Sequence, residues 1–201
     1  MKIFVACEYS GRVRDAFIKR GHDAISCDFL PSESDKGPHI IGDVLEIMDD
    51  WGGQLGWKPD LMIAHPPCTY IANSGVSWLY RQEGRWEKMV EGAKFFKRFL
   101  DADVEKICVE NPTMHGHALK IVQSNYTQAV QPWMFGEDAS KRTCLWLKGL
   151  PELKSTNPLI KKRYANQTPS GQNKLGPSED RAKIRSLTYQ GIADAMAAQW
   201  G

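Results

Sequence analysis

The sequence lacks the features of a membrane or secreted protein. Its 201 residues contain no apolar run that approaches 18 residues, the length that a membrane-spanning helix needs. The N-terminal segment reaches Glu8 and Arg12 almost at once, and no cleavage site follows an apolar run, so a signal peptide is not expected. We therefore expect a cytoplasmic protein with no membrane partner.

Cysteine is scarce, and its spacing argues against two further classes. The five cysteines are odd in number and widely separated, which is typical of a reduced protein and not of a disulfide scaffold. No Cys-x-x-Cys pair is present, and the histidines have no third ligand at a usual spacing, so no metal site is expected. The cysteines are Cys7, Cys27, Cys68, Cys108 and Cys144.

Charge is nearly balanced overall but is unevenly distributed. The net charge is only +2. Residues 1–140 carry 15 Lys and Arg against 20 Asp and Glu, whereas residues 141–185 carry 11 against 3. A basic segment after an acidic body is typical of a surface for phosphates, although a solvated basic loop has the same composition.

Short apolar runs alternate with helix-like segments over most of the chain. At 42% hydrophobic residues the chain can bury a core, and its length suits one domain with a small appendage. This alternation predicts an α/β fold with a doubly wound, mostly parallel, Rossmann-like sheet. We expect strands at residues 2–7, 23–27, 40–44, 60–64, 106–109 and 143–147, and helices at 11–20, 86–100 and 189–200.

Polar residues directly follow several of these strands, at the edge where parallel sheets bind ligands. Residues 7–11 form a strand-to-helix turn whose glycine permits a close approach of a ligand. An aspartate after the second strand is the usual partner of a ribose, and one after the third can face an adenine. Helix caps and surface acids give the same pattern singly, but together these residues favour a nucleoside-containing cofactor. The expected cofactor-binding residues are Glu8, Ser10, Gly11, Asp28 and Asp43.

Cys68 follows another strand in the segment His-Pro-Pro-Cys. Two consecutive prolines fix the backbone and present the thiol at the edge of the sheet. A thiol with a pKa of about 8.5 is mostly protonated near neutral pH, yet its thiolate is a strong nucleophile. A small buried cysteine is the alternative, but a Pro-Pro-Cys turn is a poor place for simple packing.

Glu110 follows the strand at residues 106–109 and begins the segment Glu-Asn-Pro. A carboxylate held there is expected to be desolvated and to have a raised pKa. A helix cap or a structural acid is the alternative interpretation.

The Pro-Pro-Cys and Glu-Asn-Pro segments together resemble the catalytic pair of the cytosine-C5 DNA methyltransferases, which have a class I S-adenosylmethionine-dependent fold. In that family a thiolate attacks C6 of cytosine, and an acid hydrogen-bonded to ring N3 absorbs the developing charge. C5 then accepts the methyl group, loses its proton, and the thiol is eliminated. The resemblance implies that Cys68 is the nucleophile, that Glu110 supports N3 and that S-adenosylmethionine is the cofactor.

Other segments resemble the family in the same order along the chain. Residues 8–11 lie where the family has its cofactor turn, and residues 140–143 resemble the element that supports the base. The final helix resembles the closing cofactor segment. The resemblance thus implies catalytic roles for Lys141 and Arg142, a cofactor contact for Pro66 and a substrate contact for Asn111.

The target-recognition region of the family is nearly absent, because only about 40 residues separate Leu147 from the closing segment. The chain therefore resembles a compact, phage-type member. We expect a catalytic domain at residues 1–150, a basic arm at 151–185 and a closing helix at 186–201. The expected substrate is DNA, single-stranded or read with little sequence specificity, or a pyrimidine nucleotide. The expected phosphate contacts are Lys161, Lys162, Arg163, Arg181 and Arg185.

Two alternatives remain open at this point. An amino-methyltransferase usually has Asp/Asn-Pro-Pro-Tyr/Phe, and the His-Pro-Pro-Cys segment lacks both the leading acid or amide and the following aromatic residue. A non-catalytic accessory protein that binds the cofactor or DNA is favoured by the missing recognition region and by Glu8, which stands where the family has a glycine.

Overall fold

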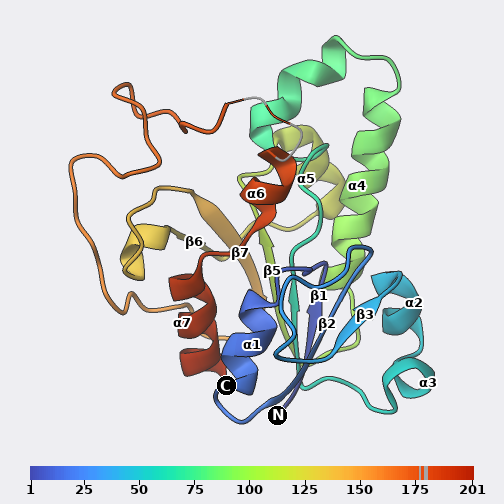
Figure 1. Ribbon diagram of the computed structural model, residues 1–201. Coiled ribbons are helices and arrows are strands. Elements are labelled where there is room, and N and C mark those ends of the chain that lie inside the picture. The colour runs from blue at the N-terminus through green and yellow to red at the C-terminus, as the bar shows by residue number, and fades with distance from the viewer. Residues whose placement is uncertain (177, 179–180) are drawn as a thin grey trace.

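A seven-stranded sheet forms the centre of the protein (Figure 1). The computed structural model describes residues 1–176, 178 and 181–201. Along the sheet the order is β3-β2-β1-β4-β5-β7-β6; the neighbours from β3 to β5 pair in parallel, and β7 runs antiparallel between β5 and β6. The strands are β1 Lys2–Ala6, β2 Asp23–Asp28, β3 His39–Ile41, β4 Leu61–Ala64, β5 Lys106–Asn111, β6 Gln128–Val130 and β7 Thr143–Lys148.

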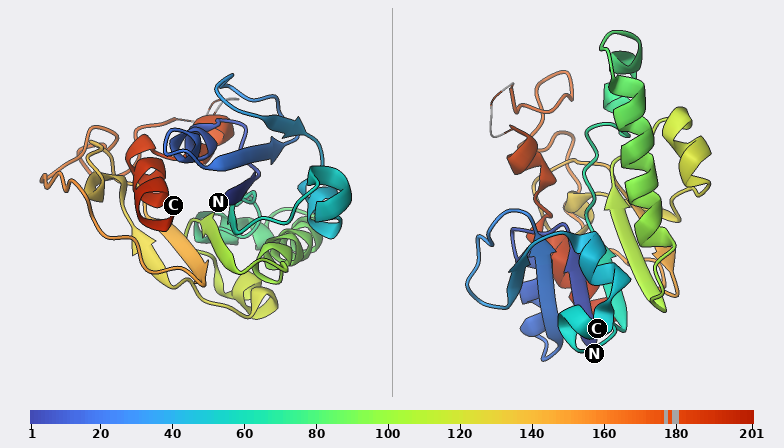
Figure 2. Two further views of the ribbon diagram at one scale, coloured as in Figure 1. Left: turned by 90° about the horizontal axis from the view of Figure 1, so that it is seen from below. Right: turned by 90° about the vertical axis from the view of Figure 1, so that its right-hand side faces the viewer.

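Helices cover both faces of the sheet and give the protein three layers (Figures 1 and 2). Helices α1 and α7 pack on one face, whereas α2, α4 and α5 pack on the other. Helix α6 lies above the carboxyl ends of the strands (Figure 1). None of the helices in the described part of the chain has the length and apolar character that crossing a membrane requires. The helices are α1 Arg12–Ile18, α2 Val44–Asp49, α3 Trp51–Leu55, η1 Asn73–Tyr80, α4 Arg85–Leu100, α5 Gly116–Val122, η2 Pro132–Met134, α6 Arg181–Ser186 and α7 Gln190–Trp200.

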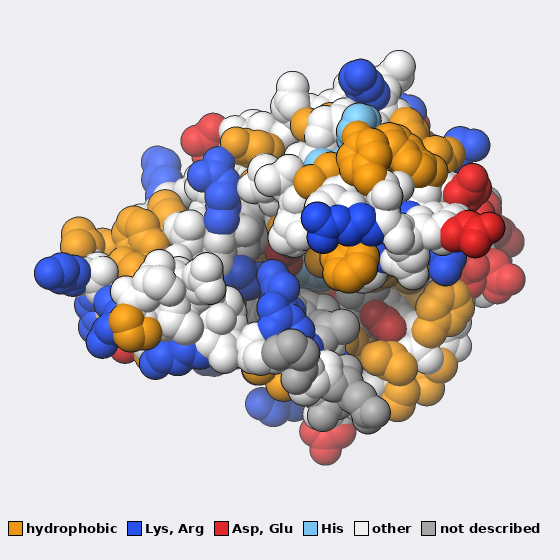
Figure 3. Space-filling view, turned by 90° about the horizontal axis from the view of Figure 1, so that it is seen from above, with side chains coloured by type: hydrophobic (Ala, Val, Ile, Leu, Met, Phe, Trp, Pro, Cys, Tyr) orange, Lys and Arg blue, Asp and Glu red, His pale blue; other side chains and the backbone are white. Residues whose placement is uncertain are grey.

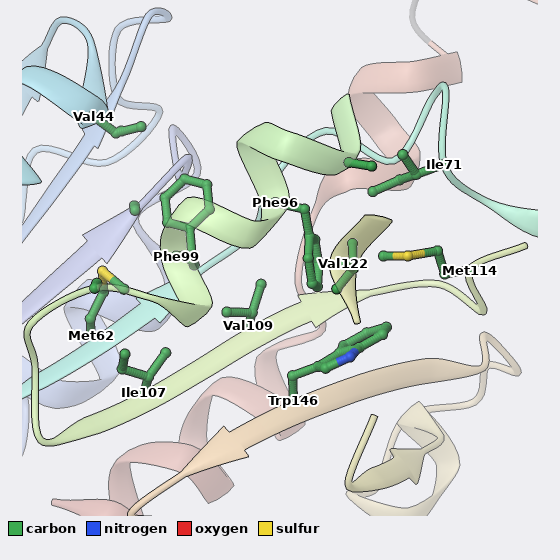
Figure 4. Packing of buried hydrophobic residues seen from close by; sticks show 14 of the residues in the cluster. Val44, Met62, Ile71, Phe96, Phe99, Ile107, Val109, Met114, Val122 and Trp146 are labelled. Carbon is green, nitrogen blue, oxygen red and sulfur yellow. The ribbon is translucent and has the colours of Figure 1, made fainter. Parts of the chain in front are cut away.

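The central strands are apolar on both faces because helices cover both. In β1, Ile3 and Val5 face α1 and α7, whereas Phe4 and Ala6 face the layer that contains α4, and all four are fully buried. On the α4 side, Phe96 packs edge-on against Trp146 of β7 with ring centroids 4.9 Å apart (Figure 4). This packing holds the antiparallel strand against the parallel part of the sheet.

The predicted doubly wound, mostly parallel sheet is confirmed, and the differences concern the ends of its elements. Strand β3 ends before Asp43, because that side chain accepts a hydrogen bond from Leu45 N (2.9 Å) and begins α2. Strand β5 continues two residues beyond its predicted end, so Glu110 and Asn111 belong to the strand and pair with β7. The sequence pattern did not indicate β6 or α5, which are only 3 and 7 residues long.

The arm after β7 is attached to the body by main-chain hydrogen bonds. Residues 151–176 contain no helix and only isolated bridges. The arm donates from Leu159 N to Trp133 O (2.7 Å) and from Ala165 N to Asp138 O (3.2 Å). Helix α6 spans the boundary that was predicted at residues 185/186, and residues 177, 179 and 180 of the predicted arm lie outside the described residues.

Arg14 connects α1 to the loop between β2 and β3. Its side chain is fully buried, an unusual state for an arginine, and it pairs with Asp15 at 2.8 Å. The guanidinium donates to Ser26 Oγ (3.1 Å) and to Ser34 O (3.0 Å). The loop that leads from β2 to β3 therefore depends on one cation.

We expect Arg14→Met to lower the free energy of unfolding by about 3–5 kcal/mol, because it leaves buried polar partners and a partly buried carboxylate without their cation. Urea denaturation followed by circular dichroism measures the change. The matched control is Arg20→Met at an exposed position, where a change within about 0.5 kcal/mol is expected. Equal losses in the two variants would contradict a structural role for Arg14.

Candidate active site

Cys68 lies on a turn directly after β4. Pro66 is buried and Pro67 is exposed, and neither has an N–H with which to continue the sheet. The carbonyl of the half-buried Cys68 accepts bonds from Ile71 N (3.1 Å) and Ala72 N (2.9 Å), which close the turn. The sequence Pro-Pro-Cys therefore ends the strand and places the thiol at the carboxyl edge of the sheet, as predicted.

Strand β5 brings Glu110 to the same edge. Strands β4 and β5 are parallel neighbours, and Ala64 is in register with Val109, so their ends lie side by side. Glu110 is 7% exposed and Asn111 only 1%. We call residues 65–73 the cysteine loop. Residues 110–115, which are the end of β5 and the segment after it, are called the glutamate loop. The two predicted catalytic segments are thus neighbours in space.

Hydrogen bonds join the cysteine loop to the glutamate loop along their length. Asn111 Nδ2 donates to Pro66 O (2.8 Å), and Asn73 N donates to Thr113 O (2.8 Å). Both ring nitrogens of His115 form hydrogen bonds. Its Nε2 bonds Tyr70 O (3.2 Å), and its Nδ1 accepts from Ala118 N (3.2 Å). Asn111, predicted as a substrate contact, therefore fixes the backbone beside Cys68 through its amide nitrogen. Its Oδ1 is buried and has no partner among the described residues.

His65 is a site residue that the sequence pattern did not indicate. Its Nδ1 lies 2.9 Å from Glu110 Oε2, and both side chains are 8% exposed. Its Nε2 is buried without a hydrogen-bond partner in the described structure. The available signal was a histidine directly before Pro-Pro-Cys, since a residue at the end of β4 must lie beside the end of β5.

The prediction of a raised pKa for Glu110 is wrong. Burial does raise the pKa of Glu110, but the charge of Lys141 and the hydrogen bond and charge of His65 outweigh it, so the pKa lies below its ordinary value. The sequence could not reveal this, because Lys141 is 31 positions away. Glu110 is therefore a carboxylate at neutral pH.

The Cys68 thiol has a pKa above its ordinary value. Burial is the main cause; Lys141 and Arg185 act against it, and the negative charge of Glu110 adds to it. The thiolate is consequently scarce at neutral pH in the absence of a substrate. Since their charges act on the Cys68 pKa, Glu110, Lys141 and Arg185 are its electrostatic neighbours.

The structure distinguishes the two basic residues that were predicted to be catalytic. Lys141 Nζ donates to Arg185 O (2.8 Å) and influences both Cys68 and Glu110. Arg142 is exposed and donates to Tyr126 OH (2.8 Å). Lys141 is thus the cation that acts on the predicted catalytic pair.

Two of the predicted cofactor acids lie at the ends of β2 and β3. Asp28 accepts through one oxygen from Leu30 N (3.0 Å), and Asp43 caps α2. Both acids retain a second carboxylate oxygen with no hydrogen bond among the described residues. Phe29 and Ile41, each next to or near one of these acids, are 69% and 63% exposed. Carboxylates beside exposed apolar side chains suit the ribose and adenine of an adenosine.

The predicted cofactor turn after β1 is mainly structural in this conformation. Glu8 accepts through Oε1 from Val13 N (2.7 Å) and through Oε2 from Arg14 N (3.2 Å), so it caps α1. Ser10 Oγ donates to Glu8 Oε1 (3.3 Å). At Gly11, with φ +72°, a Cβ would meet the Arg14 side chain at 2.6 Å. The close approach that Gly11 allows is therefore to this chain's own Arg14, and cofactor contacts by Glu8, Ser10, Gly11 and Pro66 stay predictions.

A small cavity of about 10 Å³ lies between the turn after β1 and His65. Its opposite wall is formed by residues 186–188, which are the last residue of α6 and the two residues after it. This segment is anchored by Arg12, which donates to Thr188 O (2.8 Å), and by Tyr9, which donates to Lys183 O (2.8 Å). A volume near 10 Å³ holds about one water molecule, so this end of the predicted cofactor site is closed.

The predicted phosphate contacts do not form one surface. Lys161 pairs with Asp138 at 2.6 Å, whereas Lys162 and Arg163 are exposed on the arm. Arg181 donates to the carbonyl of Leu175. Of these residues, Arg185 is the one that lies close to Cys68.

The fold has known counterparts at low sequence identity. No protein-family model and no curated protein match the sequence. The methyltransferase EhMeth of Entamoeba histolytica is 15% identical and matches 79% of this chain with a TM-score of 0.51, and the chain spans 57% of the length of EhMeth. This match shows that the two proteins share a Rossmann-like fold with a mostly parallel sheet.

Two further solved structures match more loosely. A TehB-like SAM-dependent methyltransferase of Corynebacterium glutamicum is 16% identical, with a TM-score of 0.34 over 81% of this chain and 75% of that one. A mutant of DNMT2 from Spodoptera frugiperda is 15% identical, with a TM-score of 0.37 over 82% of this chain and 53% of that one.

We expect the alkylation of Cys68 to report the charges around it. Glu110→Gln removes a negative charge, which lowers the Cys68 pKa and moves the rate–pH profile to lower pH. Lys141→Met removes a cation, which raises that pKa and moves the profile to higher pH. Mass spectrometry of the iodoacetamide-treated protein measures the rate at Cys68, with Lys148→Met at the far end of β7 as the control. Shifts in the same direction for both variants would refute this electrostatic arrangement.

Proposed function

We propose that this protein is an S-adenosylmethionine-dependent methyltransferase that transfers a methyl, or a related one-carbon group, to C5 of a cytosine in DNA or in a nucleotide. The observation that supports it most is the position of Cys68 beside Glu110. The two residues come from neighbouring strand ends, their loops are hydrogen-bonded together, and the charge of Lys141 opposes the effect of burial on the pKa of both.

The residues suit a covalent route to C5. The thiolate of Cys68 bonds to C6, the C5–C6 double bond opens and its electrons move through the ring towards C4 and N3, while N3 takes up a proton. The C4–C5 enamine is then nucleophilic at C5, which accepts the one-carbon group. A base then removes the C5 proton and the sulfur of Cys68 leaves as the thiolate, which restores the C5–C6 double bond; N3 returns its proton to Glu110.

The pair of His65 and Glu110 can supply the proton at N3. Glu110 is a carboxylate before the substrate binds, because Lys141 and His65 lower its pKa. Its neighbour His65 has Nδ1 at 2.9 Å, and the imidazolium form of His65 can pass its Nδ1 proton across this bond, which leaves a neutral imidazole and makes Glu110 a donor. Lys141 stabilises the carboxylate that re-forms once the proton has left.

The cofactor site fits S-adenosylmethionine at its adenosine end. Asp28 and Asp43 each have a free carboxylate oxygen at the edge where such folds bind nucleosides, next to exposed apolar side chains. The cofactor supplies an electrophilic methyl group. At its other end the wall formed by residues 186–188 leaves about 10 Å³, so this segment must shift for the complete cofactor to bind.

A non-catalytic accessory protein that binds DNA or the cofactor is the second candidate, and Glu8, which caps α1 where the family has a glycine, favours it. It differs from the leading proposal in one respect that can be measured. An accessory protein forms no covalent bond with its ligand.

We expect a covalent adduct when the protein is incubated with S-adenosylmethionine and single-stranded DNA that contains 5-fluorocytosine. Fluorine at C5 cannot leave as a proton, so the enzyme stays bonded to C6. Intact mass measures the adduct, which Cys68→Ala should abolish and Cys108→Ala, a buried cysteine of β5, should retain. No adduct with DNA or with 5-fluoro-dCMP, despite measurable cofactor binding, would favour the accessory protein.

We expect His65→Leu to slow formation of this adduct and to change its dependence on pH, because Glu110 then loses the donor that lowers its pKa. Without that donor, Glu110 takes up a proton at higher pH than in the wild type. The rate–pH profile of adduct formation measures the shift, and affinity for the cofactor should change little. An unchanged profile would show that His65 has no part in proton transfer.

A further inference from the structure

A large cavity opens at the carboxyl edge of the sheet, between the arm, α6 and residues 140–142. Its volume is about 640 Å³, within the range that small-molecule sites occupy. Seen from above, Lys and Arg side chains lie along the arm and around the hollowed middle of this face (Figure 3). The cavity is separate from the small closed one beside Glu8.

The described lining of this cavity contains five cationic side chains and no carboxylate. They come from four distant parts of the chain, so only the fold brings them together. None of the five forms an ion pair with a described acidic residue. The cations are Arg12, Lys141, Arg142, Lys174 and Arg185.

The hydrogen bonds of these cations go to neutral oxygens. Arg12 and Lys141 donate to main-chain carbonyls, and Arg142 donates to the hydroxyl of Tyr126. These bonds orient the side chains without neutralising them. Five positive charges around one cavity, none of them paired with a carboxylate of the described residues, repel each other and attract an anion.

The position of the cavity connects it to the candidate active site. Lys141 and Arg185 line it and also oppose the rise in the Cys68 pKa. Pro112, directly after the Glu-Asn pair, is part of its wall. An anion held here would therefore lie beside the place where the reacting base must stand.

We propose that this cavity binds the phosphate of the nucleotide whose base reacts at Cys68. The phosphate site depends only on the five cations, whereas the identity of the base rests on the function proposed above. Arginine forks and lysine ammonium groups suit phosphate oxygens. The amides of Asn166 and Asn173 line the same cavity and add neutral hydrogen-bonding groups. The phosphate belongs either to a mononucleotide or to the backbone of a single strand.

Titration of the full chain with dCMP, with 2′-deoxycytidine and with a short single-stranded oligodeoxycytidine tests this proposal at low salt. We expect dCMP or the oligonucleotide to bind about tenfold or more tightly than the nucleoside, because charge-assisted hydrogen bonds to phosphate are strong. Tight binding of dCMP identifies a mononucleotide, and binding of the oligonucleotide alone identifies a backbone phosphate. Equal affinity for all three, or no binding of either phosphate compound, would overturn the proposal.

The test variant is the double substitution Arg142→Gln with Lys174→Gln, at two exposed positions of the cavity wall. Its matched control is Lys162→Gln with Arg163→Gln, which removes the same charge from exposed positions on the arm outside the cavity. We expect the test variant to lose about tenfold or more in affinity for the phosphate compounds. Equal losses in both variants would show a general charge effect and overturn the cavity as the site.

Repeating the titration with Cys68→Ala separates this proposal from the proposed function. Phosphate binding should persist there, since the thiol is not part of the phosphate site. Binding without any adduct in the wild type would count against the covalent reaction and leave the phosphate site standing. If the adduct forms but the cavity variants bind the phosphate compounds as tightly as the wild type does, the covalent reaction is supported and the phosphate site is refuted.

Discussion

The hydrogen bonds between the cysteine loop and the glutamate loop are the constraint on which the candidate active site depends. Parallel strands β4 and β5 bring the loops together, but strand pairing ends at Ala64. Beyond it, the side chain of Asn111 and the main chain of Asn73 continue the connection. Because Pro66 and Pro67 lack N–H groups, the sheet cannot extend into the cysteine loop. The Pro-Pro pair thus ends the pairing of this strand, and the hydrogen bond from Asn111 to Pro66 O fixes the path of the cysteine loop.

Burial and the nearby positive charges shift the pKa values at this site in opposite directions, and the net result differs between Cys68 and Glu110. Burial alone would make both Cys68 and Glu110 neutral. Lys141 and His65 reverse this for Glu110, whose pKa falls, whereas Lys141 and Arg185 only partly oppose it at Cys68, whose pKa stays raised. The free protein therefore holds a carboxylate beside a thiol and avoids two adjacent anions. In the reaction proposed above, Cys68 loses a proton and Glu110 gains one when the base binds.

The sequence predicted the sheet and its reactive edge because both depend on local patterns. Buried strands appear as apolar runs, and the polar residues after them must meet at one edge. The contacts that set the properties of the site depend on distant residues. His65 bonds a residue 45 positions away, and the cavity cations Arg12 and Lys174 are 162 positions apart. No periodicity or motif indicates such neighbours, so the direction of the Glu110 pKa shift and the cationic cavity became apparent only from the fold.

The segment that follows α6 links the two cavities. Leu187 lines both of them, while Thr188 faces the small cavity and Arg185 the large one. Because one short piece of chain forms a wall of each, it cannot move away from the turn after β1 without changing the cationic cavity as well. An anion that held Arg185 in place would therefore also restrict residues 186–188, which form a wall of the small cavity beside Glu8.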